Sequence, residues 1–94
     1  MDLKRQYISN KNIVCRDEED GAFLFDPDTG NLKYMNHSAR EIFLMLNGKT
    51  SVNHLLENLQ KLYNDVAAEH LQDDVNEFLK QLESGGFISL PDSH

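Results

Sequence analysis

The sequence has a single cysteine, few basic side chains and no long apolar run. One thiol cannot form a disulfide within the chain, so no disulfide framework stabilises it. A membrane-spanning helix needs roughly 18 consecutive apolar residues, and the first residues also lack the apolar segment of a secretory signal. We therefore expect a cytoplasmic protein without a membrane partner.

Acidic residues outnumber basic ones, and the formal net charge is −7. Nucleic acids and anionic membranes are bound through Lys and Arg that neutralise phosphate, so this balance argues against both as main partners. The negative charge is concentrated between residues 65 and 85, where six carboxylates accompany one lysine. A solvated helix face is the simpler interpretation of this stretch, and a surface for a basic partner is the alternative.

The first half of the chain has the pattern of short strands joined by tight turns. Three segments rich in β-branched or aromatic residues are typical of strands, namely 13–16, 22–25 and 31–35. Residues 26–30, Asp-Pro-Asp-Thr-Gly, form a turn sequence, since proline presets φ and glycine permits positive φ. Strands joined this closely predict an antiparallel meander.

The rest of the chain has apolar residues at helical spacing. The last strand runs directly into a helix expected over residues 36–46, with Asn36 as its N-cap. Ser38 and Glu41 offer a competing capping box for the same helix. The helix should end at Asn47-Gly48, a usual C-terminal signal.

Two further helices follow in the pattern. Thr50 or Ser51 would cap the second helix, and Asp65 would cap the third. Gly85-Gly86 would end the third helix, after which residues 87–90 look like a short extended return onto the core.

These elements predict a single domain of the α+β class. It is winged-helix-like, with a three-stranded antiparallel sheet at the N-terminus followed by three helices. The domain is expected to span residues 13–90. Residues 1–12 would form a flexible N-terminal arm, which Tyr7 and Ile8 could attach to the core, and residues 91–94 would form a C-terminal tail.

Few residues have the pattern of a reactive site. Cys15 lies in an expected strand with Arg16 pointing to the opposite face, so a buried, inert thiol is the simpler interpretation. His70, Asp73 and Asp74 share a helix face, but one histidine without a cysteine is a weak metal-ligand set. We therefore expect no catalysis, no metal and no cofactor.

Binding is then the expected role. A small meander leaves strand edges whose free N–H and C=O groups can accept a peptide as an added strand, or pair two copies into a homodimer. The third helix carries two neighbouring stripes, one for the core and one for a groove. The core stripe is Val75, Leu79 and Leu82. The groove stripe is Leu71, Asp74, Phe78 and Gln81, although Phe78 suits the core equally well.

Three motifs, in this order, resemble the PqqD-like family of peptide chaperones, also called RiPP recognition elements. They are the junction Met35-Asn36…Ala39…Ile42, the turn Asn47-Gly48…Thr50 and the helix Asp74-Val75…Phe78-Leu79…Leu82. Met35 stands where the family usually has Leu, and Asn47 where it usually has Asp. The resemblance covers about residues 13–90.

The resemblance implies a winged-helix-like fold that has no catalytic activity of its own. It also implies binding of the leader of a ribosomally made precursor peptide, which is handed to a modifying enzyme, often a radical SAM enzyme. In the family the leader adds to the third strand and lies against the third helix. A nucleic-acid-binding winged helix and a protein adaptor are the alternative interpretations.

Carried over to this chain, the resemblance implies a peptide-binding site with two walls. Its residues are Leu32, Lys33, Tyr34, Met35, Leu71, Asp74, Val75, Phe78, Gln81 and Leu82. Asp74 would pair with a basic leader residue, and Lys33 with an acidic one.

Overall fold

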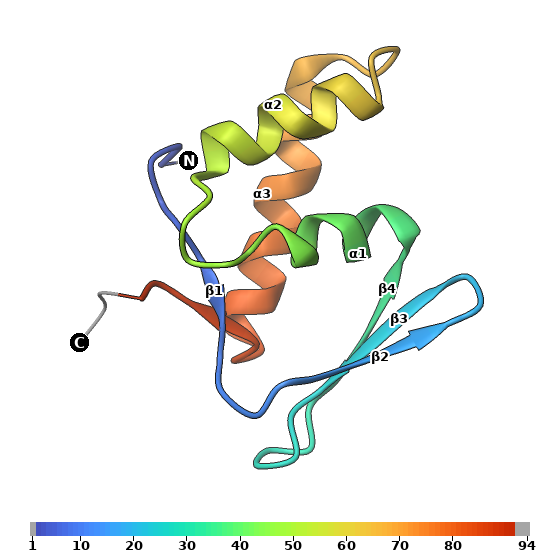
Figure 1. Cartoon of the computed structure of the whole chain (residues 1–94), viewed down its shortest axis with the longest axis vertical. Helices are drawn as coiled ribbons and strands as arrows, with labels where there is room; N and C mark the ends of the chain where they lie inside the picture. Colours follow the sequence, from blue (N-terminus) through green and yellow to red (C-terminus); the bar gives the residue numbers. More distant parts are fainter. Residues whose placement is uncertain (1, 92–94) are drawn as a thin grey trace.

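Figure 1 shows the computed structural model of the chain, which describes residues 2–91. The elements in order are β1 (Ile8–Ser9), β2 (Val14–Glu18), β3 (Gly21–Phe25), β4 (Leu32–Asn36), α1 (His37–Leu44), α2 (Val52–Leu62), α3 (Ala68–Ser84) and β5 (Ile88–Ser89). The order of a three-stranded sheet followed by three helices confirms the expected α+β class. Of the expected C-terminal tail, all but Pro91 lies outside the described residues.

Strands β2, β3 and β4 form the antiparallel meander that the turn sequences predict. Val14 lies opposite Phe25, and Phe25 lies opposite Leu32 in the next strand. The β3–β4 turn is closed by Gly30, whose N–H donates to the carbonyl of Asp26 at 2.7 Å. Gly30 has a φ of +81°, a conformation that glycine adopts without a steric penalty.

The strand-to-helix junction forms at Asn36 as expected. The Asn36 side-chain oxygen accepts from the N–H of Ala39 at 2.9 Å and caps α1. The competing capping box is not used. The Tyr63 hydroxyl, which comes from the end of α2, instead lies within 3.2 Å of both the Ser38 hydroxyl and the Glu41 carboxylate.

Of the N-caps expected for α2 and α3, the first is confirmed and the second is not. Ser51, one of the two expected residues, caps α2 by accepting from the N–H of His54 at 3.2 Å. The prediction of Asp65 as the cap of α3 is wrong, because α3 begins only at Ala68 and has no side-chain cap. The Gln60 amide donates to the carbonyls of Tyr63 and Val66, which extends the turn beyond Asp65.

The N-terminal segment differs from the expected arm, because it lies against the core. β1 pairs antiparallel with β5, the extended return near the other end of the chain. Tyr7 is buried. The carbonyls of Arg5 and Leu3 accept from the N–H groups of Val52 and Asn53 at 2.9 and 2.8 Å. The segment thus supplies acceptors to two amides in the first turn of α2, which have no partner within a helix.

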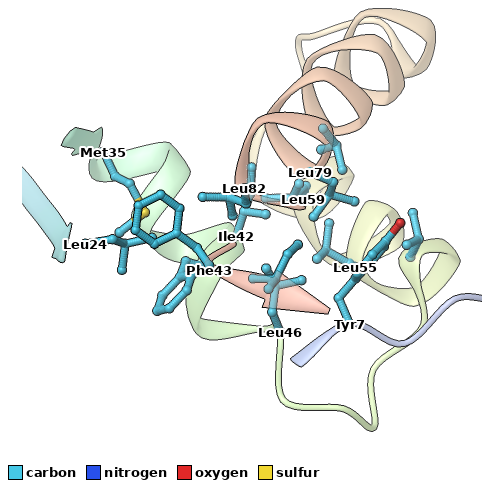
Figure 2. Packing of buried hydrophobic residues seen from close by; sticks show 14 of the residues in the cluster. Tyr7, Leu24, Met35, Ile42, Phe43, Leu46, Leu55, Leu59, Leu79 and Leu82 are labelled. Atoms are coloured by element: carbon cyan, nitrogen blue, oxygen red, sulfur yellow. The ribbon is translucent and has the colours of Figure 1, made fainter. Parts of the chain in front are cut away.

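The hydrophobic core gathers side chains from every layer of the fold. Figure 2 shows Leu24 and Met35 from the sheet meeting Ile42 and Phe43 of α1, while Tyr7 lies on the side of α2. One face of the sheet is therefore covered, with Ala22, Leu24 and Met35 almost inaccessible to solvent. The α2 and α3 helices contribute the rest of the core, which includes Leu55, Leu59, Val75, Leu79 and Leu82.

We expect Gly21→Ala to destabilise the protein by about 3 kcal/mol, because a Cβ at this position would lie 2.1 Å from the Met35 carbonyl oxygen. The strand β4 that follows would have to move away from β3. Gly30→Ala is the matched control, because its Cβ would meet nothing within 4 Å and only the positive φ costs about 1 kcal/mol. Urea unfolding of both variants measures the difference, and equal losses would contradict the close approach.

Candidate functional site

The candidate site begins at the free edge of β4. Within residues 2–91, β4 pairs with a strand on one side only, since the sheet order is β2-β3-β4. The carbonyl of Asn31 accepts from the N–H of Asp26 at 2.9 Å. This bond determines which residues of β4 direct their backbone N–H and C=O groups toward β3, because hydrogen-bonded and non-hydrogen-bonded pairs alternate along two antiparallel strands. The backbone groups of Lys33 and Met35 then point toward β3, whereas those of Leu32 and Tyr34 point to the open edge.

Two hydrogen bonds join β4 and the residue before it to the end of α3 and the residue after it. The Lys33 ammonium donates to the side-chain oxygen of Gln81 at 2.8 Å. The Asn31 amide donates to the carbonyl of Gly85 at 2.8 Å. Both bonds are exposed, and they place the C-terminal end of α3 next to β4. The structure therefore brings the two expected walls together at Lys33 and Gln81.

An apolar hollow lies beyond the other end of β4, where the chain enters α1. Its volume is about 210 Å³, and all three helices contribute to it. Its lining residues are Ser38, Ile42, Leu59, Tyr63, Val66, Leu71, Asp74 and Val75. Ser38 follows closely on the last residue of β4, so the open edge leads toward the hollow.

The expected wall residues of α3 fall into two groups. Leu71 is half-buried and Asp74 exposed at the hollow, while Phe78 is half-buried and packs against the core. Val75 and Leu82 are almost fully buried. Leu82 thus supports the site from within rather than forming its surface, and Val75 reaches only the floor of the hollow.

The expected residues of β4 alternate between the two faces of the sheet. The Met35 side chain is 1% exposed. Figure 2 shows it among the core side chains. Leu32 and Tyr34 are exposed and point to the outer face, opposite Phe25 and Phe23. The Lys33 side chain reaches α3, where it bonds to Gln81.

Sequence reasoning missed the residues of the hollow that come from α1 and α2. Leu59 and Tyr63 have the same helical spacing as the core residues of α2, so no local signal separates them. Tyr63 joins the end of α2 to α1 at the edge of the hollow, because its hydroxyl hydrogen-bonds with Ser38 and Glu41. This contact depends on how α1 and α2 pack, which the sequence pattern does not specify.

The prediction that Cys15 is buried is wrong. The residue is exposed on β2, an edge strand of the sheet. Partial burial of the thiol and the nearby Asp17 carboxylate nevertheless raise the pKa of Cys15, while Arg40 opposes the shift. Arg40 bonds to Asp17 at 2.7 Å, and this hydrogen bond lowers the pKa of Asp17.

Neither a metal centre nor a membrane span is found in the part of the chain that the structure describes. Residues 2–91 contain no group of three or more His, Cys, Asp or Glu side chains placed to hold a metal ion. None of the helices α1 to α3 has the length and apolar character needed to cross a bilayer.

We expect Cys15 to react slowly with iodoacetamide at pH 7.5, because the raised pKa keeps the thiol protonated. Alkylation should be several-fold faster in urea, where burial and the Asp17 carboxylate no longer act. Mass spectrometry of timed samples measures both rates. A faster reaction in the folded protein would show an activated thiol instead.

Comparison with known proteins gives one family. The family model described as coenzyme PQQ synthesis protein D (PqqD) matches residues 21–88, which run from the start of β3 to the first residue of β5. No significant match is found among curated proteins or among solved structures. The matched region includes the free edge of β4 and the whole of α3, and it covers most of the chain. The chain belongs to the PqqD family.

Proposed function

We propose that this protein binds the leader segment of a ribosomally made precursor peptide as a strand added to β4, and presents it to a modifying enzyme. A radical SAM enzyme is one such partner. The observation that carries the proposal is the free edge of β4 at Leu32 and Tyr34, which lies beside α3 and leads toward an apolar hollow. Proteins of the PqqD family bind a precursor peptide and interact with a biosynthetic enzyme, as accessory proteins rather than catalysts.

In strand addition, backbone and side-chain contacts contribute differently to peptide binding. The outward N–H and C=O groups of Leu32 and Tyr34 supply hydrogen bonds that any extended peptide can make. Alternate side chains of the added strand would point toward α3. There they would meet Phe78 and, beyond the end of β4, the hollow beside Leu71. The backbone would thus provide affinity, and the apolar contacts would select the peptide.

Two charged side chains would add direction to this recognition. Asp74 lies at the hollow and would favour a basic leader residue. Lys33 already bonds to Gln81, and an acidic leader residue would have to replace that partner. A hydrogen bond of this kind is worth about 1 kcal/mol net, so its exchange is a small cost beside several main-chain bonds.

The direct test is a titration of the isotope-labelled protein with the precursor peptide encoded beside its gene. We expect amide shifts at residues 31–35 and 71–82, since these line the edge and the wall. Removing the leader half of the peptide should abolish the shifts. Shifts confined to other elements would refute the proposed site.

We expect Phe78→Ala to weaken peptide binding by about tenfold, because the ring is a large, half-buried apolar side chain of α3 that the leader would contact. The free energy of unfolding should fall by only about 1–2 kcal/mol. The matched control is Leu82→Ala, whose fully buried side chain should cost about 3 kcal/mol of stability and leave affinity nearly unchanged. Urea unfolding and calorimetric titration separate the two, and the reverse pattern would place Phe78 in the core.

We expect Asp74→Lys to lower affinity for a leader with a basic residue by about five- to tenfold at low salt, because attraction becomes repulsion. The difference from the unmodified protein should shrink as salt is added. Asp73→Lys makes the same change in net charge at an exposed neighbour that does not line the hollow. Equal losses in both variants would point to general electrostatics rather than to a contact of Asp74.

A further inference from the structure

The outer face of the β2-β3-β4 sheet, opposite the face that carries Ala22, Leu24 and Met35, carries an apolar surface. We call this surface the outer patch. It consists of Val14, Phe23, Phe25, Leu32 and Tyr34. Val14, Phe25 and Leu32 lie opposite one another across the three strands, and their side chains surround a hollow of about 440 Å³.

The exposure of the outer patch is unusual for a sheet of this kind. Antiparallel sheets with one covered face normally turn polar side chains to the other. Here Val14, Leu32 and Tyr34 are 50%, 62% and 47% exposed. The rings of Phe23 and Tyr34 pack edge to face at 5.2 Å, which holds both in place on the surface. A contiguous apolar patch with a polar rim is typical of an interaction surface.

The charges around the outer patch indicate what could cover it. Glu18, Glu19 and Asp20 lie at one end of the sheet, and Asp28 lies at the other. Arg16 lines the same hollow as the outer patch, and its guanidinium is paired with the Glu18 carboxylate at 3.7 Å. A second copy stacked on this face would bring like charges together, which is unfavourable. An occupant with an apolar centre and Lys or Arg at its rim fits better.

We propose that the outer patch is the docking surface for the modifying enzyme, through an enzyme surface with an apolar centre and a basic rim. The identity of this partner rests on the proposed function. A peptide strand added to β4 would extend the sheet, and every second side chain of that strand would lie on the outer face, next to Leu32 and Tyr34. An enzyme on the outer patch would therefore contact the carrier and the bound peptide together.

The test uses Val14→Lys, because Val14 lies on β2, at the opposite edge of the sheet from the peptide strand. The probes are the peptide-modifying enzyme and the precursor peptide encoded beside the gene. We expect the variant to weaken enzyme binding by at least about tenfold and to change peptide affinity by less than about twofold. Leu62→Lys is the matched control, since its side chain is 59% exposed on α2 and the charge change is the same.

Mapping of amide shifts with the enzyme gives the second readout. Shifts at β2 and β3, and binding of the unmodified protein that weakens with added salt, support the proposal. Unchanged enzyme binding by Val14→Lys, shifts confined to the helices, no binding of the enzyme, or self-association through this face would each overturn it. If the enzyme binds the outer patch while the peptide does not bind at β4, the assignment of the docking surface is supported and the proposed peptide-binding function is refuted.

Discussion

The structure depends on the junction at which β4 becomes α1. Asn36 ends the strand opposite Gly21 and caps the helix by accepting from Ala39. Because no loop intervenes, the direction of the strand determines where the first turn of the helix lies. This one constraint places the free edge of β4 and the mouth of the apolar hollow next to each other. The close approach of Gly21 to the Met35 carbonyl maintains the register on which both depend.

The N-terminal segment and β5 serve the site indirectly. β1 and β5 form a second, two-stranded sheet that joins the two ends of the domain. The carbonyls of Leu3 and Arg5 complete the first turn of α2. Since α2 supplies Leu59 and Tyr63 to the hollow, the position of the hollow depends on residues far from it in the sequence.

Two surfaces of the same small sheet would then have different roles. The edge of β4 offers main-chain hydrogen bonds, which are suited to an extended peptide. The outer patch offers apolar side chains with an acidic rim, which are suited to a folded partner. An added strand would share both surfaces, because its backbone would pair with β4 and alternate side chains would lie beside the patch. A carrier of this design would hold a peptide and a protein side by side on one sheet.

Every element after residue 12 could be predicted from the sequence in its correct order, whereas β1 could not. Turn residues, the Asn36 cap and the helical spacing of apolar residues are local signals, so the meander, α1 and the core stripe of α3 were predicted correctly. Tertiary packing decided the rest. Asp65 does not cap α3, because the Gln60 side chain stabilises a turn that continues past it. Tyr7 is buried in the core next to β1, whose partner strand β5 lies some eighty residues away in the chain. The burial of Met35 and the contact between Tyr63 and Ser38 depend on how the elements pack, because an apolar residue at strand spacing suits a core and an exposed face equally.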